Sequence, residues 1–78
     1  MNQYNEKGEP DGYWKRYFIN EKLSTKGTYI NGKRHGYWEY YFRNGKFHWR
    51  GSFNNDQLIG YWEWYDIDGK IEKKEFYL

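Results

Sequence analysis

Residues 36–51 read GYWEYYFRNGKFHWRG, and this stretch decides the fold. Two segments rich in aromatic residues flank the dipeptide Asn44-Gly45, which is a strong hairpin signal between alternating side chains. A tight hairpin turn needs positive φ at its central positions, which glycine, asparagine and aspartate adopt at the least cost. The stretch therefore predicts two antiparallel strands joined by a two-residue turn at Asn44-Gly45.

The same pattern recurs along the chain at a fixed spacing. Gly-Tyr-Trp begins at positions 12, 36 and 60, and turn dipeptides stand at 20–21, 44–45 and 68–69. A fixed period of this length is typical of proteins built from stacked structural units. The sequence predicts an all-β fold, a single elongated antiparallel meander of β-hairpins in three 24-residue repeats. Residues 1–78 form one domain, with a partial unit at 1–11 and repeats at 12–35, 36–59 and 60–78, the last truncated.

The composition excludes several classes of protein. The 78 residues include 5 Trp, 10 Tyr and 5 Phe, which argues against disorder and leaves room for one small core. The absence of Cys excludes disulfides and favours a reducing, cytoplasmic location. No apolar run is long enough to span a bilayer, and the first residues lack the apolar region of a signal peptide. The 13 basic and 11 acidic residues are well mixed, so the charge balance argues against a nucleic-acid partner.

The two-residue turn at Asn44-Gly45 places Phe42 opposite Phe47, Tyr40 opposite Trp49, Glu39 opposite Arg50, and Trp38 opposite Gly51. In the first hairpin the same arithmetic places Lys15 opposite Lys26, a like-charge pair. Because the period is even, equivalent residues of successive repeats point to the same side of the sheet. One face is then apolar and carries Trp14, Phe18, Leu23, Tyr29, Trp38, Tyr40, Phe42, Phe47, Trp49, Phe53, Trp62, Trp64 and Ile71. The other face carries Tyr13, Lys15, Tyr17, Tyr37, Glu39, Tyr41, His48, Arg50, Tyr61, Glu63, Tyr65 and Lys74.

Two local features of these hairpins carry further expectations. A tryptophan beside a strand glycine, as in the pairs Trp14–Gly27 and Trp38–Gly51, covers exposed backbone. At the first turn Glu21 stands where glycine belongs. We therefore expect Glu21 to hold an unfavourable positive φ or to lengthen the loop.

The central unit resembles the MORN repeat. The run Gly27-x-Tyr29-x-Asn31-Gly32-Lys33-x-His35-Gly36-x-Trp38, followed by Tyr41 and Asn44-Gly45-Lys46, is similar to the bacterial variant in YwqK-like proteins, some of which are antitoxins. The resemblance covers residues 8 to about 71, and it departs from the pattern at Glu21, Asp56 and Glu75. It implies an elongated sheet of stacked hairpins that serves as a binding scaffold, through protein binding in some members and membrane association in others. It implies no catalytic residues.

The residue pattern also favours binding over catalysis. No His, Cys or carboxylate cluster has the spacing of metal ligands, and the strand glutamates have basic cross-strand neighbours. We expect His35 to be a turn residue and His48 to lie on the polar face opposite Tyr41. No catalytic, cofactor-binding or metal-binding residue is therefore predicted. A single layer cannot bury an aromatic face unless something covers it, and exposed aromatic surface generally marks an interaction site.

Three kinds of partner fit this sequence. The leading prediction is another protein, with the chain acting as a non-enzymatic protein-binding module such as a small inhibitor or antitoxin that occludes its partner; a homodimer through the aromatic face is a variant of it. The alternative is a membrane surface, where Trp and Tyr sit at the headgroup level, although no basic patch stands out. The third is single-stranded nucleic acid, which the carboxylates along the sheet disfavour. The candidate partner-binding residues are Tyr13, Tyr17, Tyr37, Tyr41, Tyr61, Tyr65 and Arg50.

Overall fold

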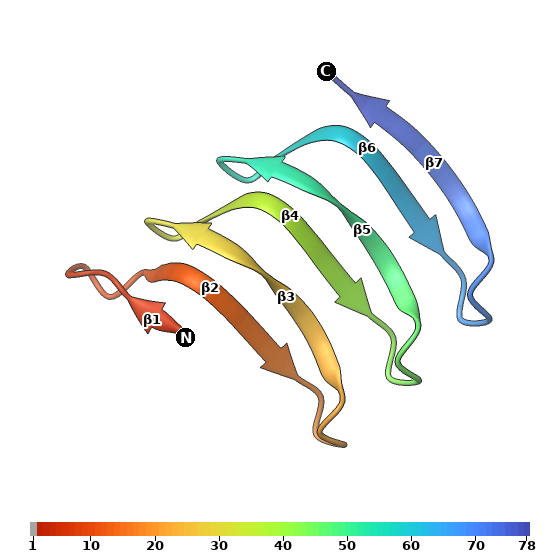
Figure 1. Cartoon of the computed structure of the whole chain (residues 1–78), viewed down its shortest axis with the longest axis horizontal. Coiled ribbons are helices and arrows are strands. Elements are labelled where there is room, and N and C mark those ends of the chain that lie inside the picture. Colours follow the sequence, from red (N-terminus) through yellow and green to blue (C-terminus); the bar gives the residue numbers. More distant parts are fainter. Residues whose placement is uncertain (1) are drawn as a thin grey trace.

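The computed structural model describes residues 2–78 as one antiparallel sheet whose seven strands follow in sequence order (Figure 1). The strands are β1 (Gln3–Tyr4), β2 (Pro10–Tyr17), β3 (Leu23–Ile30), β4 (Lys33–Tyr41), β5 (Phe47–Asn54), β6 (Gln57–Tyr65) and β7 (Ile71–Tyr77). None of residues 2–78 is helical, and the predicted all-β meander is confirmed. This part of the chain accordingly holds no apolar helix of bilayer-spanning length. The Cα atoms extend over 41 × 36 × 12 Å, so the sheet is a single layer.

The turns at one end of the strands, between β3 and β4 and between β5 and β6, are tight turns of two residues. Between β3 and β4, Asn31 and Gly32 have φ of 49° and 83°, and between β5 and β6, Asn55 and Asp56 have φ of 50° and 68°. Positive φ at both central positions matches the right-handed twist of the flanking strands. Asn and Asp are the residues after glycine that adopt this conformation most readily, so the sequence specifies these turns locally.

The loops at the other end of the strands are longer than predicted. The amide of Gly45 donates to the carbonyl of Phe42 at 2.9 Å, and the amide of Phe42 donates to the carbonyl of Lys46 at 2.8 Å. The loop therefore has three residues, of which only Gly45 holds a positive φ, 90°. A tight turn followed by one left-handed residue is the next most common hairpin connection. Glu21 takes the same place in the first loop with a φ of 71°, which confirms the expected strain.

The longer loop changes which side chains share a face. Tyr40 pairs with Trp49 as predicted, but Tyr41 pairs with Phe47, because His48 is an extra residue in β5. A β-bulge of this kind shifts the register by one residue and moves side chains to the other face. Phe47 stacks on Tyr41 with 5.1 Å between ring centroids, so its assignment to the apolar face, opposite Phe42, is wrong.

The same register shift occurs in the other two long-loop hairpins. Leu23 pairs with Tyr17 in the β2–β3 hairpin, and Ile71 pairs with Tyr65 in the β6–β7 hairpin. Residues directly opposite each other in an antiparallel pair point to the same side. Leu23 and Ile71 therefore also lie on the side of the tyrosines, and their assignment to the apolar face is corrected for the same reason.

The core lies on one side of the sheet, which we call the tryptophan face. Trp38, Phe53 and Trp62 are at most 2% exposed. Half-buried Tyr29, Tyr40, Trp49, Leu58, Trp64 and Tyr77 pack against these three side chains. Ring-to-ring contacts with centroids 4.9–6.4 Å apart cross the whole sheet in the order Tyr4, Trp14, Tyr29, Trp38, Phe53, Trp62, Trp64, Tyr77.

A single layer buries these rings because each central tryptophan lies over a glycine of the preceding strand. A Cβ on Gly27 would overlap the indole of Trp38, and a Cβ on Gly51 would overlap that of Trp62. Trp38 Nε1 also donates to the carbonyl of Thr28 at 3.0 Å. Trp38 does have Gly51 as its Cα partner, as predicted, but its ring covers Gly27 on the other side.

A second bulge brings the Trp38 ring over that glycine. The register of β3 and β4 shifts between Lys26 and Thr28, so that residues 36–38 stand opposite Gly27 alone. Gly36 begins this segment with a φ of 78°, a conformation that other residues rarely adopt. The glycine of the Gly-Tyr-Trp signature therefore allows the bend that places the following tryptophan.

Cationic side chains cover the tryptophan face where no further layer exists. The guanidinium carbons of Arg16 and Arg34 lie 5.2 Å and 4.1 Å from the ring centroids of Trp14 and Phe53. Lys73 Nζ lies 4.8 Å from the ring centroid of Trp64. Long basic side chains bury their stems on apolar surface and keep their charge in water, so they complete this small core.

Candidate functional site

The side of the sheet opposite the tryptophan face carries a row of charged residues flanked by tyrosines, and we call it the tyrosine face. The row crosses six strands as successive Cα partners, Lys15, Lys26, Glu39, Arg50, Glu63 and Lys74. The flanking tyrosines are Tyr13, Tyr17, Tyr37, Tyr41, Tyr61 and Tyr65. Residues directly opposed across antiparallel strands share a face, so all seven candidate residues lie on this one.

Glu39 is held by three neighbours on this face. The hydroxyl of Tyr37 donates to its Oε2 at 2.9 Å, and the hydroxyl of Tyr41 donates to Oε1. Lys26 Nζ, on the preceding strand, lies 3.2 Å from Oε1, and the Glu39 side chain is only 12% exposed. We call this arrangement a glutamate clamp: a glutamate, the tyrosines two residues before and after it, and a cation on the preceding strand.

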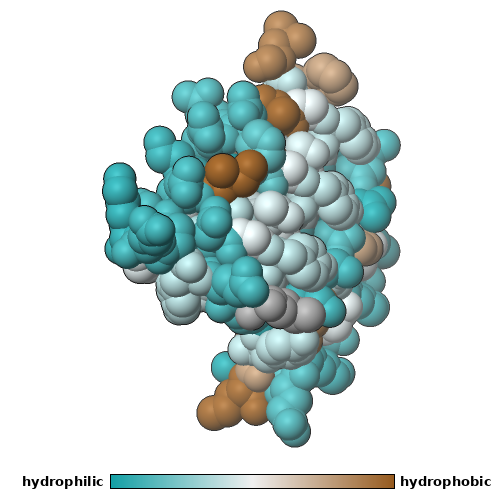
Figure 2. Space-filling view, turned by 60° about the vertical axis from the view of Figure 1, so that its left-hand side comes forward, coloured by the Kyte–Doolittle hydropathy of each residue, from teal (hydrophilic) through white to brown (hydrophobic). Residues whose placement is uncertain are grey.

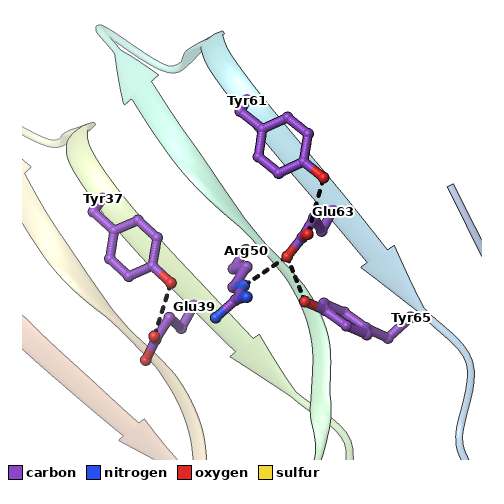
Figure 3. A network of polar contacts seen from close by, with 6 residues as sticks. All are labelled: Tyr37, Glu39, Arg50, Tyr61, Glu63 and Tyr65. Carbon is purple, nitrogen blue, oxygen red and sulfur yellow. Dashed lines mark hydrogen bonds and ion pairs between the residues drawn. The ribbon is translucent and has the colours of Figure 1, made fainter. Parts of the chain in front are cut away.

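A second glutamate clamp surrounds Glu63, at the equivalent position of the next repeat (Figure 3). Tyr61 donates to Oε2 at 2.9 Å, Tyr65 donates to Oε1, and Arg50 Nε donates to Oε1 at 2.9 Å. Arg50 is the Cα partner of Glu39, as predicted, but its ion pair is with Glu63. Every residue inside a sheet has two cross-strand neighbours, and here each glutamate pairs with the cation of the preceding strand.

The clamps raise the pKa values of their tyrosines and lower those of their glutamates, so both kinds of group titrate further from neutral pH. Burial and the hydrogen bond to Glu39 raise the pKa of Tyr37 to about 12 and raise that of Tyr41 as well. Burial opposes ionisation of Glu39, but the hydrogen bonds from Tyr41, Tyr37 and Lys26 lower its pKa. The hydrogen bond from Tyr65 and the guanidinium of Arg50 lower the pKa of Glu63. The phenols therefore stay donors and the carboxylates stay charged at neutral pH, an arrangement that holds side chains in place rather than transferring protons.

The tyrosines differ in how much they present to solvent. Tyr13, Tyr17, Tyr37 and Tyr61 are 44%, 59%, 52% and 49% exposed. Tyr41 and Tyr65 are half-buried, because Phe47 packs between them with centroids 5.1 Å and 5.9 Å away. Phe47 is therefore a member of this face that sequence reasoning missed. Only the loop length at Asn44-Gly45 could have revealed it.

Lys15 stands where the clamps have a glutamate. It lies between Tyr13 and Tyr17 on β2, one repeat before Glu39, and its ammonium is 5.9 Å from the ring centroid of Tyr13. Within residues 2–78, neither Tyr13 nor Tyr17 has a hydrogen bond through its hydroxyl. The like-charge neighbour Lys26, predicted opposite Lys15, is its Cα partner.

The two histidines lie away from this network. His48 stacks on Phe42 with centroids 4.2 Å apart, so its placement beside Tyr41 is wrong; the bulge in β5 is the reason. His35 lies within β4 opposite Thr28, not in the turn, and its Nδ1 is buried without a hydrogen-bond partner. Among residues 2–78, no three His, Cys, Asp or Glu side chains lie close enough together to hold a metal ion.

Two open hollows lie beside loops, and the second of them borders the tyrosine face. One, of about 490 Å3, is bordered by Asn5, Glu6, Lys7, Glu9 and Asn31, and the other, of about 370 Å3, by Gly45, Lys46, Phe47, Tyr65, Asp68 and Gly69. On the side of the molecule visible in Figure 2, strongly hydrophobic residues form small separate groups beside a pale band of intermediate hydropathy. The broad aromatic surface, rather than a deep pocket, is therefore the candidate recognition surface.

Comparisons with protein-family models, with curated proteins and with solved structures find no match to this chain. The similarity to MORN repeats stays a prediction from residues 27–46. The geometry of the tyrosine face thus carries the functional argument by itself.

Proposed function

We propose that this chain is a non-enzymatic protein-binding module that occupies a partner protein through its tyrosine face. In this proposal it is a MORN-like scaffold that acts in the cytoplasm as a small inhibitor or antitoxin, by occlusion. The observation that carries it is the state of Tyr37 and Tyr61. Both rings are about half exposed, yet their hydroxyls are tied at 2.9 Å to Glu39 and Glu63.

Fixed aromatic side chains suit protein recognition for an energetic reason. A tyrosine that is already held loses little rotamer freedom on binding, and its ring supplies flat amphipathic contact area. Tyr and Trp also dominate the binding energy of protein interfaces. The tyrosines recur on strands β2, β4 and β6 of one rigid layer, so they present a regular surface rather than a single anchor.

The charges of this face favour a protein over the two alternatives. Lys26 and Arg50 are paired with Glu39 and Glu63 within the sheet, so neither cation is free to neutralise phosphates. Anionic lipid surfaces and nucleic acids both gain affinity mainly from clustered unpaired cations. A mixed row of ion pairs between aromatic rings instead resembles the composition of a protein interface.

The engaged state of the carboxylates supports the non-enzymatic part of the proposal. Glu39 and Glu63 each accept bonds from two phenols and a cation, and their pKa values are lowered rather than raised toward neutrality. A general acid or base works best with a pKa near the operating pH. These glutamates serve to orient tyrosines.

Affinity capture from the native cell, with partners identified by mass spectrometry and re-measured with purified proteins, tests the proposal. Replacing Tyr13, Tyr37 and Tyr61 together by Ser should abolish capture and leave the sheet folded. The matched control replaces Arg16 and Lys73, on the tryptophan face, by Ser and should retain the partner. Loss of capture only in the control would show that the partner binds the tryptophan face instead. Binding of the wild type to anionic vesicles or single-stranded oligonucleotides, with no protein captured, would contradict the proposal.

A further inference from the structure

We infer that Tyr13, Lys15 and Tyr17 form an open clamp that binds a carboxylate side chain of an acidic segment in a polypeptide partner. This inference rests on the proposed function, since it names the chemistry that the partner must present at one end of the tyrosine face. The equivalent positions of three successive repeats hold Lys15, Glu39 and Glu63.

The two glutamate clamps show what fits between such a tyrosine pair. In each clamp the phenols two residues before and after the centre donate to the two oxygens of one carboxylate. A cation of the preceding strand completes the set, at 3.2 Å for Lys26 and 2.9 Å for Arg50. The planar, two-oxygen acceptor is thus matched to donors that arrive from both sides along the strand.

On β2 the central acceptor is replaced by a donor. An ammonium has three N–H donors and no lone pair, so Lys15 cannot accept from Tyr13 or Tyr17 as a glutamate would. No side-chain hydrogen bond joins these three residues, and Tyr13 and Tyr17 are 44% and 59% exposed. Hydrogen bonds between an ionised acceptor and these donors would be of the strong, charge-assisted kind.

The surroundings of Lys15 leave its charge without an internal partner. Lys26, the neighbour on β3, is already paired with Glu39 at 3.2 Å. On the outer side, Asn2 bonds through its side chain to the backbone nitrogen and oxygen of Lys15, both at 2.8 Å, and brings no carboxylate. The row of charges therefore begins with two adjacent lysines, and only the second is neutralised.

A carboxylate side chain fits this place better than a phosphate. Glu39 lies on the next strand but one, within the same row, and would repel a dianion more strongly than a single charge. Glu39 and Glu63 are also direct examples, in the same structural setting, of a carboxylate that meets all the donors. An acidic partner residue over Lys15 would bring neighbouring parts of that segment onto Tyr37 and the rest of the tyrosine face.

Titration of the full chain with a short polyglutamate peptide, followed by NMR, tests the open clamp. We expect the largest shifts at Tyr13, Lys15 and Tyr17. Lys15→Glu supplies the missing carboxylate from the chain itself, so it should weaken peptide binding by about tenfold or more, the effect of losing a charge-assisted hydrogen bond.

Controls separate the open clamp from general charge attraction and from the wider proposal. Lys70→Glu makes the same charge change at an exposed position beyond the row and should bind the peptide as the wild type does. The double variant Tyr13→Phe, Tyr17→Phe keeps both rings and should lose affinity. Equal weakening by Lys15→Glu and Lys70→Glu, or no peptide binding by the wild type, would overturn the inference. If Lys15→Glu still captured the protein partner, the open clamp would be wrong while the proposed function stood. If polyglutamate bound but no protein was captured, the proposed function would be wrong while the open clamp stood.

Discussion

The indole of Trp38 lies directly over Gly27, on the strand that precedes its own hairpin, and its Nε1 donates to the carbonyl of the next residue, Thr28, at 3.0 Å. Trp62 repeats the arrangement over Gly51. Because the glycine has no side chain, the ring can approach the backbone and fill the space that a second layer would otherwise occupy. This contact joins one hairpin to the next and is the main packing unit of the sheet.

Gly27→Ala should destabilise the protein by about 1 to 3 kcal/mol, because the added Cβ must displace the Trp38 ring. The measurement is the midpoint of urea unfolding, with Thr28→Ala as the control on the same strand. In the double variant Gly27→Ala, Trp38→Leu, the two effects should not add, since both act at one contact. A wild-type midpoint for Gly27→Ala would show that the ring does not need the glycine.

Trp38→Ala should cost about 3 to 5 kcal/mol of unfolding free energy, the range for a large side chain that is only 1% exposed. Tyr41→Ala, on the tyrosine face, should cost much less because its ring is half-buried and packs mainly on Phe47. Both variants can be compared by urea unfolding monitored by fluorescence. Equal losses for the two variants would reverse the assignment of core and binding face.

Glu21→Gly should stabilise the protein by about 0.5 to 1 kcal/mol. The left-handed conformation costs a non-glycine residue about 1 to 2 kcal/mol, and the greater freedom of glycine in the unfolded chain offsets part of that gain. Gly45→Ala, at the equivalent place with a φ of 90°, should have the opposite sign. Thermal unfolding of the two variants gives the comparison, and a destabilised Glu21→Gly would mean that the Glu21 side chain makes a contact of its own.

The glutamate clamps predict a broad pH range of maximal stability. The pKa values of Glu39 and Glu63 are lowered in the folded state, so their contribution is present above the unfolded value of about 4.3 and is lost as pH falls toward the folded values. The pKa of Tyr37 is raised to about 12, so its contribution is present below the unfolded value of about 10 and is lost as pH rises between the two.

Urea midpoints measured across pH check this prediction. Glu39→Gln together with Glu63→Gln should reduce the loss of stability at acid pH, and Tyr37→Phe should reduce the loss of stability at alkaline pH. If the urea midpoint of the glutamine variant still falls at acid pH as steeply as that of the wild type, other carboxylates are responsible for the loss.

The two edges of the sheet should keep the wild-type chain monomeric. At one edge Asn2 donates to the carbonyl of Tyr13 at 3.1 Å, and β1 covers the start of β2. At the other edge Glu75 occupies the position equivalent to Gly51 in the preceding repeat, where a glycine would accept the tryptophan of a following unit. We therefore expect sedimentation to show a monomer.

Glu75→Gly combined with removal of residues 1–9 should produce head-to-tail assemblies, because it exposes Trp14 at one edge and a receiving glycine at the other. Neither change alone should produce an assembly, since the contact between two copies needs both altered edges. A wild-type dimer would instead indicate burial of the tryptophan face between two copies.

The sequence by itself determined the strand order, the turn positions and the separation of the six candidate tyrosines from the tryptophans. These features depend on residues close together in the chain: Asn31-Gly32 sets its own turn, and alternation along residues 37–41 sends successive side chains to opposite faces. The Cα pairs Glu39–Arg50 and Trp14–Gly27 were predictable for the same reason.

Tertiary structure alone decided which neighbour each side chain uses. A residue within a sheet has one partner across its own hairpin and another on the adjacent hairpin, and a hairpin pattern in the sequence identifies only the first. Trp38 covers Gly27 rather than Gly51, and Arg50 pairs with Glu63 rather than Glu39. The bulges that begin at Gly36 and Gly60 bend β4 and β6 and set how each hairpin meets the one before it. The position of an extra residue in a strand depends on packing across the whole layer, which a local pattern does not encode.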